Sequence, residues 1–265
     1  MTTAPIKALT FDTGGTVLDW HSGFRAAFET AGARHGLTVD GAALANDLRR
    51  RSMAMMLNLG AEGPPDRNFD DAHRLCLDAL LADHGLSVFD DSDRKAIAWD
   101  APHGLMAWPD VAEGLAALRQ EYITVSFSLL SYRLVIDTAR RNALTWDAVL
   151  SCEGLGLYKL LPDAYRRAAK RLQLPPECCL MVACHPYDLD AARAVGFQTA
   201  LIRRPTEWGN LADAAPSLPP RGTYDFDVDS VTELAHLLAM RGSGPRTDVV
   251  RLHHDKTPLE QGTHS

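Results

Sequence analysis

The amino-acid sequence predicts an α/β protein with a doubly wound parallel sheet and an inserted helical segment. From residue 109 onward, short apolar runs alternate with helix-like segments of about ten residues, which is the pattern of βαβ units. Before that point, roughly eighty residues show only helical periodicity. We therefore expect a core domain of residues 1–19 and 103–240, a helical domain of residues 20–102, and a polar tail of residues 241–265.

The first expected strand covers residues 6–11, an apolar run that ends at Asp12 and leads into a turn with the sequence TGGT. Helical periodicity follows from residue 22 to residue 86. Within it, Phe24 and Phe28 fall on one helix face. No strand-like run interrupts this stretch, so we expect the insert to be entirely helical.

The remaining elements alternate in type. Helices are expected at residues 111–119, 134–142, 163–172 and 189–194, and strands at residues 123–128, 148–151, 180–183 and 199–202. Ligands of parallel sheets bind at the carboxyl ends of the strands, so the residues directly after each strand are the candidates for function. The polar segment from residue 241 onward is expected to be a poorly ordered tail.

Composition and charge narrow the classes of partner. Of the 265 residues, 46% are hydrophobic and 23% are charged, which is typical of a globular protein. The formal net charge is -7 and no long run of Lys or Arg occurs, so neither nucleic acid nor an anionic membrane is an expected partner. No apolar stretch approaches the ~18 residues that span a bilayer. A homodimer is left open.

The cysteines and the N-terminal segment indicate the cellular compartment in which we expect the protein. The five cysteines are Cys76, Cys152, Cys178, Cys179 and Cys184. Their number is odd and their spacing does not match a metal site, so we expect reduced thiols in a cytoplasmic protein. The first strand begins within a few residues of the N-terminus, which leaves no room for a signal peptide.

Four polar residues mark functional positions: Asp12, Ser128, Lys159 and Asp188. A single Asp after a strand is more often a helix cap than a nucleophile, but four such residues in this order are a specific pattern. The order and spacing resemble the haloacid dehalogenase superfamily, and the resemblance covers about residues 6–208. It implies a Rossmann-like core, a helical cap over the active site, and a nucleophilic role for Asp12.

Three sequence stretches are similar to the type II (S)-2-haloacid dehalogenases. They are DTGGTVLDW at residues 12–20, MVACHPYDL at residues 181–189 and RRPTEWG at residues 203–209. This resemblance implies a hydrolase that cleaves a carbon–halogen bond through an aspartyl ester, without a metal or another cofactor. The implied substrate is a small anionic organic acid.

The same resemblance suggests two residues that bind substrate. Arg49 falls where the family has the cap arginine that binds halide and carboxylate. Because Arg49 lies in a run of three arginines, a solvated helix face is an equal alternative. Tyr165 falls where the dehalogenases have a tyrosine in contact with substrate, and a structural tyrosine on an amphipathic helix is the equal alternative.

Elementary chemistry suggests roles for the other polar residues. Lys159 lies in an apolar run and would keep its charge beside carboxylates, thereby holding Asp12 ionised. Thr16 could brace Asp12. Asp188 could orient the hydrolytic water or pair with Lys159. His185 is a candidate base for ester hydrolysis, although a structural histidine is the more frequent case.

Two substitutions favour halide over phosphate chemistry. Phosphatases of the superfamily carry a second Asp two residues after the nucleophile, where this chain has Gly14. Halide needs no proton to leave, whereas an alkoxide does. Cys184 replaces the first acid of the fourth motif and is a poor ligand for Mg²⁺. No metal site is therefore expected.

The predicted substrate pocket also contains Thr13, Gly14, Thr16, Leu129 and Ser128. The hydroxyl of Ser128 could bind the substrate carboxylate. Dehalogenases of this type usually have an aromatic residue in place of Gly14 and an Asn in place of Leu129, so the pocket loses an apolar wall and an amide donor.

Two alternatives remain open. One is a Mg²⁺-dependent phosphatase or phosphonatase-like hydrolase. Phosphonatases of the superfamily need a cap lysine that forms a Schiff base, and Lys95, near the end of the helical insert, is its only lysine, which disfavours that version. The other is a degenerate member that binds a small acid without turnover.

Overall fold

The computed structural model describes residues 4–60, 67–210 and 217–242 of the chain. Its centre is a parallel sheet of six strands in the order β3-β2-β1-β4-β5-β6. The strands are β1 Ala8–Phe11, β2 Ile123–Ser128, β3 Ala148–Ser151, β4 Cys179–Ala183, β5 Gln198–Ile202 and β6 Phe226–Val228. This arrangement confirms the predicted fold class.

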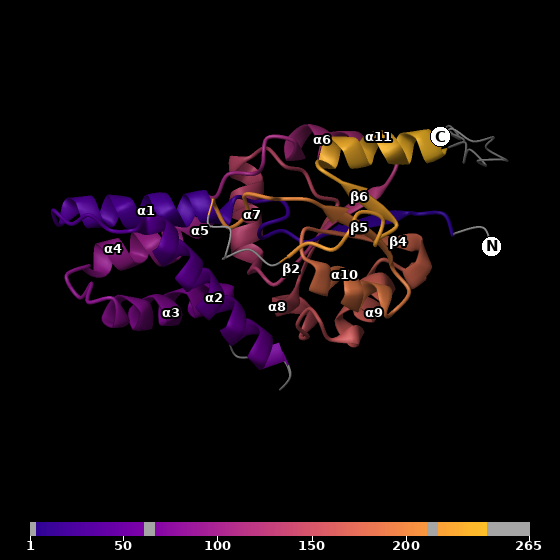
Figure 1. The fold of residues 1–265 in the computed structure, drawn as a ribbon. Helices are drawn as coiled ribbons and strands as arrows, with labels where there is room; N and C mark the ends of the chain where they lie inside the picture. The colour runs from indigo at the N-terminus through magenta and orange to yellow at the C-terminus, as the bar shows by residue number, and fades with distance from the viewer. Residues whose placement is uncertain (1–3, 61–66, 211–216, 243–265) are drawn as a thin grey trace, which may run out of the picture.

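The central strands are apolar because both of their faces are covered. Every residue of β1 is buried, as is typical of a parallel strand between two helix layers. Figure 1 shows α6 and α11 on one side of the sheet and α9 and α10 on the other. The chain reverses its direction of winding between β1 and β4, which pair in register from Ala8↔Cys179 to Phe11↔Val182. This switch point is where a sheet of this kind binds its ligand.

Helices flank the strands as follows. They are α6 Val111–Leu118, α7 Tyr132–Arg141, α8 Cys152–Leu155, α9 Pro162–Arg171, the 3₁₀ turn η2 Pro176–Cys178, α10 Pro186–Arg193 and α11 Val231–Gly242. The start of α7 differs from the predicted position because the Ser131 side chain accepts a hydrogen bond from Leu134 N and begins the helix earlier. Similarly, α10 begins at Pro186, a residue whose fixed φ suits the first turn of a helix.

The segment between β1 and α6 is helical in its described part, as expected. It contains α1 Trp20–Arg34, α2 Gly41–Gly60, α3 Phe69–Asp83, α4 Asp91–Lys95, the π-helical turn η1 Ala96–Asp100 and α5 Ala101–His103. Figure 1 shows these helices gathered beside the sheet. A capping box at Asn68 and Asp71 begins α3. We call these helices the helical segment, which begins with α1 at Trp20.

Two elements at the end of the core were not predicted. Strand β6 has only three residues, too few for a recognisable alternation. Helix α11 carries Val231, Leu234 and Leu238 on its buried face and extends to Gly242, so the polar tail does not begin at residue 241. The rest of that predicted tail, residues 243–265, lies outside the described residues.

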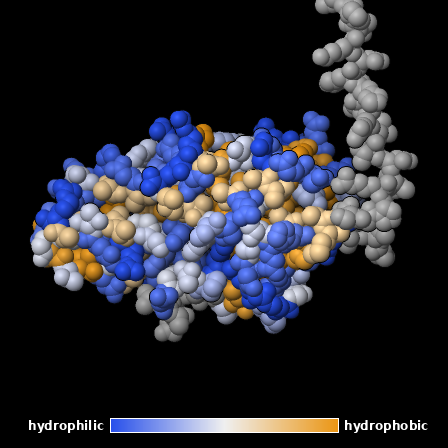
Figure 2. All heavy atoms as spheres, turned by 90° about the horizontal axis from the view of Figure 1, so that it is seen from above, coloured by the Kyte–Doolittle hydropathy of each residue, from blue (hydrophilic) through white to orange (hydrophobic). Residues whose placement is uncertain are grey.

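Figure 2 shows one face of the molecule, on which hydrophilic residues predominate and apolar ones are interspersed. None of the described helices is long and apolar enough to cross a membrane. All five cysteines lie in the described part of the chain, where each is buried and unpaired.

Candidate active site

A cavity lies between the carboxyl ends of the strands and the helical segment. Its sheet side includes Asp12, Gly14, Ser128, Leu129, Lys159 and His185. Its helical side includes Arg49, Met53, Leu57 and Phe69. The free volume is about 20 Å³, which is room for about one water molecule. The cavity therefore brings together most of the predicted site residues.

Lys159 links the two predicted carboxylates. Its Nζ donates to Asp12 Oδ1 at 2.9 Å and to Asp188 Oδ2 at 2.6 Å. Burial opposes the charge of Lys159, but the two carboxylates outweigh burial and raise its pKa. Burial likewise opposes ionisation of Asp12, but the charge of Lys159 and a hydrogen bond from His185 hold the pKa of Asp12 well below its usual range. Asp12 is therefore ionised and close to the cavity, as a nucleophile must be.

Asp188 differs from Asp12 although both contact Lys159. Burial and the negative charge of Asp12 raise the pKa of Asp188, even though Lys159 acts in the opposite direction. Asp188 Oδ1 also accepts a 2.5 Å hydrogen bond from the hydroxyl of Tyr165. A carboxylate with a raised pKa is the better proton acceptor of the two.

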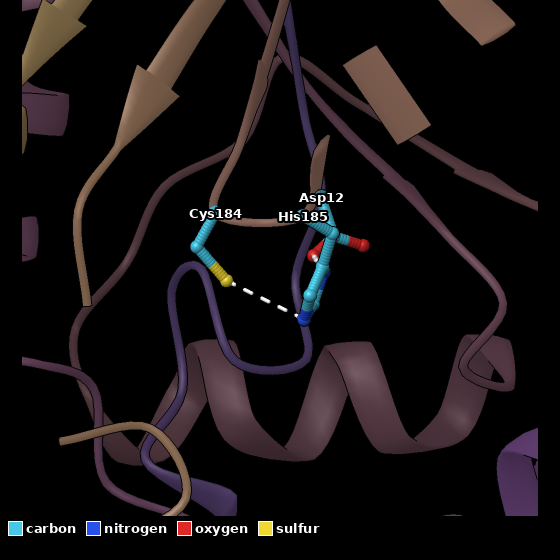
Figure 3. Close-up of side chains that lie close together, drawn as sticks. All are labelled: Asp12, Cys184 and His185. Atoms are coloured by element: carbon cyan, nitrogen blue, oxygen red, sulfur yellow. Dashed lines mark hydrogen bonds and ion pairs between the residues drawn. The ribbon is translucent and has the colours of Figure 1, made fainter. Parts of the chain in front are cut away.

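The second oxygen of Asp12 has two donors. Thr16 Oγ1 donates to Asp12 Oδ2 at 2.8 Å, which is the bracing contact predicted for Thr16. His185 Nδ1 lies 3.1 Å from the same oxygen. Figure 3 shows that one carboxylate oxygen of Asp12 faces the imidazole and that the other points away from it, while Cys184 approaches the ring from its other edge.

Glu207 completes a hydrogen-bonded triad with His185 and Asp12. His185 Nε2 lies 2.9 Å from Glu207 Oε1, so both nitrogens of the ring face a carboxylate oxygen. Burial disfavours the imidazolium, but the carboxylates of Glu207 and Asp12 on either side of the ring hold the pKa of His185 well above its usual value. The Cys184 thiol, whose own pKa is raised by burial, is neutral near pH 7 and adds little. A ring that donates from both nitrogens has no free lone pair. The role of His185 as a base for ester hydrolysis therefore stays a prediction, and in the resting site the ring faces two acceptors.

A glycine makes room for this triad. Gly15 has φ +94°, and a Cβ on it would lie 2.3 Å from Glu207 Oε1. Trp20 Nε1 donates to the same oxygen at 2.9 Å. The TGGT turn and the first residue of α1 together hold Glu207 against His185.

Arg49 is buried and faces the cavity. Its guanidinium lies 3.4 Å from the carbonyl oxygen of Gly14 and stacks over the rings of Trp20 and Phe69, at 5.3 and 5.9 Å. The alternative of a solvated helix face is therefore wrong for Arg49, whereas its neighbour Arg50 is exposed.

Two predicted substrate contacts lie elsewhere. Tyr165 is fully buried, because α9 directs its ring against Phe127, and its hydroxyl supports Asp188 from behind the cavity. The hydroxyl of Thr13 pairs with that of Ser126 at 2.8 Å and is likewise outside the cavity lining. Both residues support the site and do not line it.

Ser128, Gly14 and Leu129 line the cavity as predicted. The hydroxyl oxygen of Ser128 accepts from Leu130 N at 3.1 Å, which leaves its proton free to bond a ligand. The prediction missed Tyr187, which lines the cavity and stacks on His185 with ring centroids 5.2 Å apart.

The described residues fit Mg²⁺ poorly. Asp12, Cys184 and His185 lie close enough together to surround an ion. Thiol and imidazole are nevertheless poor ligands for Mg²⁺, which prefers oxygen. Moreover, each carboxylate oxygen of Asp12 and Asp188 already accepts a hydrogen bond from Lys159, Thr16, His185 or Tyr165.

Comparison with known proteins agrees with this site. Residues 6–196 match the model of the haloacid dehalogenase-like hydrolases. (S)-2-haloacid dehalogenase 1 of Pseudomonas sp. (strain CBS-3) is 29% identical over 206 residues, which cover 76% of this chain and 86% of that protein. (S)-2-haloacid dehalogenase 4A of Burkholderia cepacia is 29% identical over 245 residues, which cover 88% and 95%.

Solved structures show the same likeness. A defluorinating L-2-haloacid dehalogenase is 33% identical, with a TM-score of 0.82 over 90% of this chain and 100% of that one. The L-2-haloacid dehalogenase of Xanthobacter autotrophicus with chloropropionic acid covalently bound shares the fold, with a TM-score of 0.73 at 23% identity over 90% of this chain and all of its own. With the family model matched over most of its length, this chain belongs to the haloacid dehalogenase-like hydrolases.

Proposed function

We propose that this hydrolase cleaves the carbon–halogen bond of a small 2-haloacid through an aspartyl ester, without a metal ion. The observation that carries the proposal is the environment of Asp12. It is an ionised carboxylate held by Lys159 at 2.9 Å, in a cavity that also contains buried Arg49. The similarity to (S)-2-haloacid dehalogenases supports the choice of substrate.

In the first step, an Asp12 oxygen attacks C2 of the substrate. A carbon–oxygen bond forms, and the halide leaves with the electron pair of the carbon–halogen bond. Arg49 is placed to bind the substrate carboxylate or the departing halide, because its planar guanidinium offers several fixed donors. No acid is needed at position 14, where this chain has Gly14.

In the second step, water hydrolyses the ester. Asp188 lines the cavity and has a raised pKa, so it is placed to accept a proton from the water. The product is a 2-hydroxy acid. One halide ion and one proton are released for each molecule of water consumed.

Halide release from (S)-2-chloropropionate tests this proposal. The purified protein should release chloride, and saturating EDTA should leave the rate unchanged. Asp12→Asn should reduce the rate to below a few per cent of wild type, because an amide is a far weaker nucleophile. Asp91→Asn, which changes a carboxylate that is 97% exposed, is the matched control and should retain full activity.

Mass spectrometry of the intact protein adds a direct measurement. After rapid acid quenching, wild type should carry a substrate-derived adduct on Asp12 that the Asp12→Asn variant lacks. The proposal would be falsified by EDTA-sensitive hydrolysis of a phosphate ester in place of halide release, which would identify the magnesium phosphatase alternative. Binding of the acid without halide release would identify a degenerate member.

A further inference from the structure

The two oxygens of Asp12 are not equivalent. Among the described side chains, Oδ1 accepts only from Lys159, whereas Oδ2 accepts from both Thr16 and His185. Hydrogen bonds to charged groups lower the reactivity of the lone pairs that accept them. The less engaged oxygen, Oδ1, is therefore the attacking atom, and Oδ2 becomes the carbonyl oxygen of the ester.

We propose that Thr16 and His185 form the oxyanion hole for breakdown of the aspartyl ester, and that Glu207 is a positioning residue that keeps His185 in this role. The inference rests on the ester mechanism of the proposed function. It concerns the second step only, in which negative charge develops on Oδ2.

The electron balance of this step shows what the donors do. Water adds its oxygen to Cγ of Asp12 and passes one proton to Asp188, and the carbonyl π electrons move onto Oδ2. The tetrahedral oxyanion then collapses and the Cγ–Oδ1 bond breaks. The product alkoxide, which now carries Oδ1, takes a proton from Lys159. Lys159 regains a proton from the new Asp12 carboxyl, whose hydroxyl came from water, and the proton held by Asp188 is released to solvent. Donors that already point at Oδ2 stabilise the oxyanion without reorganising.

Thr16 is fixed as a donor by its second contact. Its Oγ1 accepts a hydrogen bond from Cys184 N at 2.9 Å, so its own proton is directed to Asp12 Oδ2. His185 is fixed from behind by Glu207. The Glu207 carboxylate is itself held by Trp20 and confined by the backbone of Gly15.

Glu207 matters most after the ester has formed. Several titratable groups face His185: Asp12 from the end of β1, Glu207 from the loop after β5, and Cys184 and Tyr187 from its own segment. Esterification removes the charge of Asp12. Burial raises the pKa of the Cys184 thiol, and the pKa of Tyr187 is also raised, so both are neutral near pH 7. Glu207 is then the one full negative charge in contact with the ring.

Glu207→Gln tests the inference because it removes this charge and preserves the shape. Rapid-quench measurements with (S)-2-chloropropionate should show an undiminished first-turnover burst of halide. Steady-state turnover should fall at least about tenfold, the loss expected from one impaired oxyanion donor. The ester should accumulate on Asp12 in the intact-protein mass spectrum. Glu113→Gln, at an exposed position on α6, is the matched control.

The pH profile separates this role from simple support of the fold. In wild type the raised pKa of His185 keeps the ring protonated through neutral pH. In Glu207→Gln the pKa should fall toward its ordinary value of about 6.5. Because a charged donor stabilises the oxyanion more strongly than a neutral ring does, steady-state activity of the variant should fall as pH rises from about 6 to 8, whereas wild type stays level. His185→Asn keeps an N–H donor that does not titrate. It should slow ester breakdown without any pH dependence in this range.

Each outcome is decisive. Equal loss of burst and steady state in Glu207→Gln, with no new pH dependence, would overturn the inference and make Glu207 a structural residue. If Glu207→Gln does not fold, a pH-dependent or unimpaired His185→Asn would overturn it instead. Absence of any ester in wild type would refute the proposed function itself. The wild-type measurement therefore distinguishes failure of the proposed function from failure of this inference.

Discussion

Arg49 is the one guanidinium that the helical segment brings into the cavity, among the residues the structure describes. Lys at this position would keep the charge but lose the planar fork that bonds a carboxylate in two places. We expect Arg49→Lys to lower kcat/KM by roughly ten- to hundredfold, the equivalent of about 1.5–3 kcal/mol for a hydrogen bond to a charged group. Steady-state halide release measures this loss, and Arg49→Ala should lose slightly more.

Arg50→Ala is the control, since Arg50 follows Arg49 on α2 but is exposed. Arg51 is less suitable because it forms ion pairs with Asp47 and Asp83. Unchanged kinetics in Arg49→Ala would show that the substrate anion is bound elsewhere in the cavity.

At the scale of single residues, the sequence predicts those site residues that lie at or near the ends of strands. Asp12 directly follows β1, Ser128 is the last residue of β2, and Asp188 lies in the first turn of the helix after β4. Chain order alone therefore brings these side chains to one edge of the sheet. Glu207 could not be recognised in the same way. It comes five residues after β5, and its role depends on a hydrogen bond to His185, 22 positions away in the sequence.

Tyr165 shows the opposite error. The resemblance predicts a substrate contact at Tyr165, but packing decides where its ring points. With Phe127 and Phe197 as neighbours, the ring is fully buried and its hydroxyl reaches Asp188 and not the cavity. A spacing in the sequence cannot distinguish the two directions.

Asp110 joins three elements of the core. It accepts from Arg204 at 2.8 and 3.0 Å and from Val231 N, the first residue of α11, at 2.7 Å. Asp110→Asn should lower the free energy of unfolding by about 1.5–3 kcal/mol, because an amide cannot accept both contacts as a charged group does. Urea unfolding measures the difference.

The pH dependence of this difference follows from the pKa of Asp110. Burial raises the pKa of Asp110, but the hydrogen bonds from Arg204 and Val231 N lower this pKa by more than burial raises it. The net shift is therefore downward. The stabilisation is therefore present above the unfolded value of about 3.9 and is lost as pH falls through the folded value. Glu29→Gln, in an exposed pair with Arg25, should change stability by less than about 0.5 kcal/mol. An equal effect of both variants would refute the role of Asp110.

Whole elements were predictable where burial is uniform. Strands β1, β2 and β4 are buried over nearly their full length, and their apolar runs are visible in the sequence. Strand β3 is only half-buried, and its prediction depended on its place between two helices. Strand β6 showed neither a long apolar run nor a position between two predicted helices, because an edge strand of three residues needs little apolar sequence.

The net charge of the molecule has the same sign as the anionic substrate that we propose it binds. The net charge of -7 acts at long range, whereas Arg49 and Lys159 act inside a cavity that salt screens little. Raising the ionic strength from about 0.01 to 0.15 M shortens the Debye length from about 30 to 8 Å. We expect kcat/KM to rise by up to about threefold, with kcat unchanged.

The salt should have a bulky, non-halide anion, and sucrose at equal osmolality serves as the control. A fall in kcat/KM would show that the cationic cavity, and not the net charge, governs the approach of the substrate.

The composition could predict the sign of the long-range field. It could not predict that the helical segment closes the cavity to about 20 Å³, because that depends on how two sets of helices pack.

Trp20 gives the protein a built-in optical probe. Its indole N–H bonds Glu207, its ring lies beneath the guanidinium of Arg49, and Trp208 stands edge-on at 5.0 Å. A fluorophore with these neighbours senses both the charge state of the triad and the position of the Arg49 guanidinium. Its emission can therefore follow a single turnover in real time without a label.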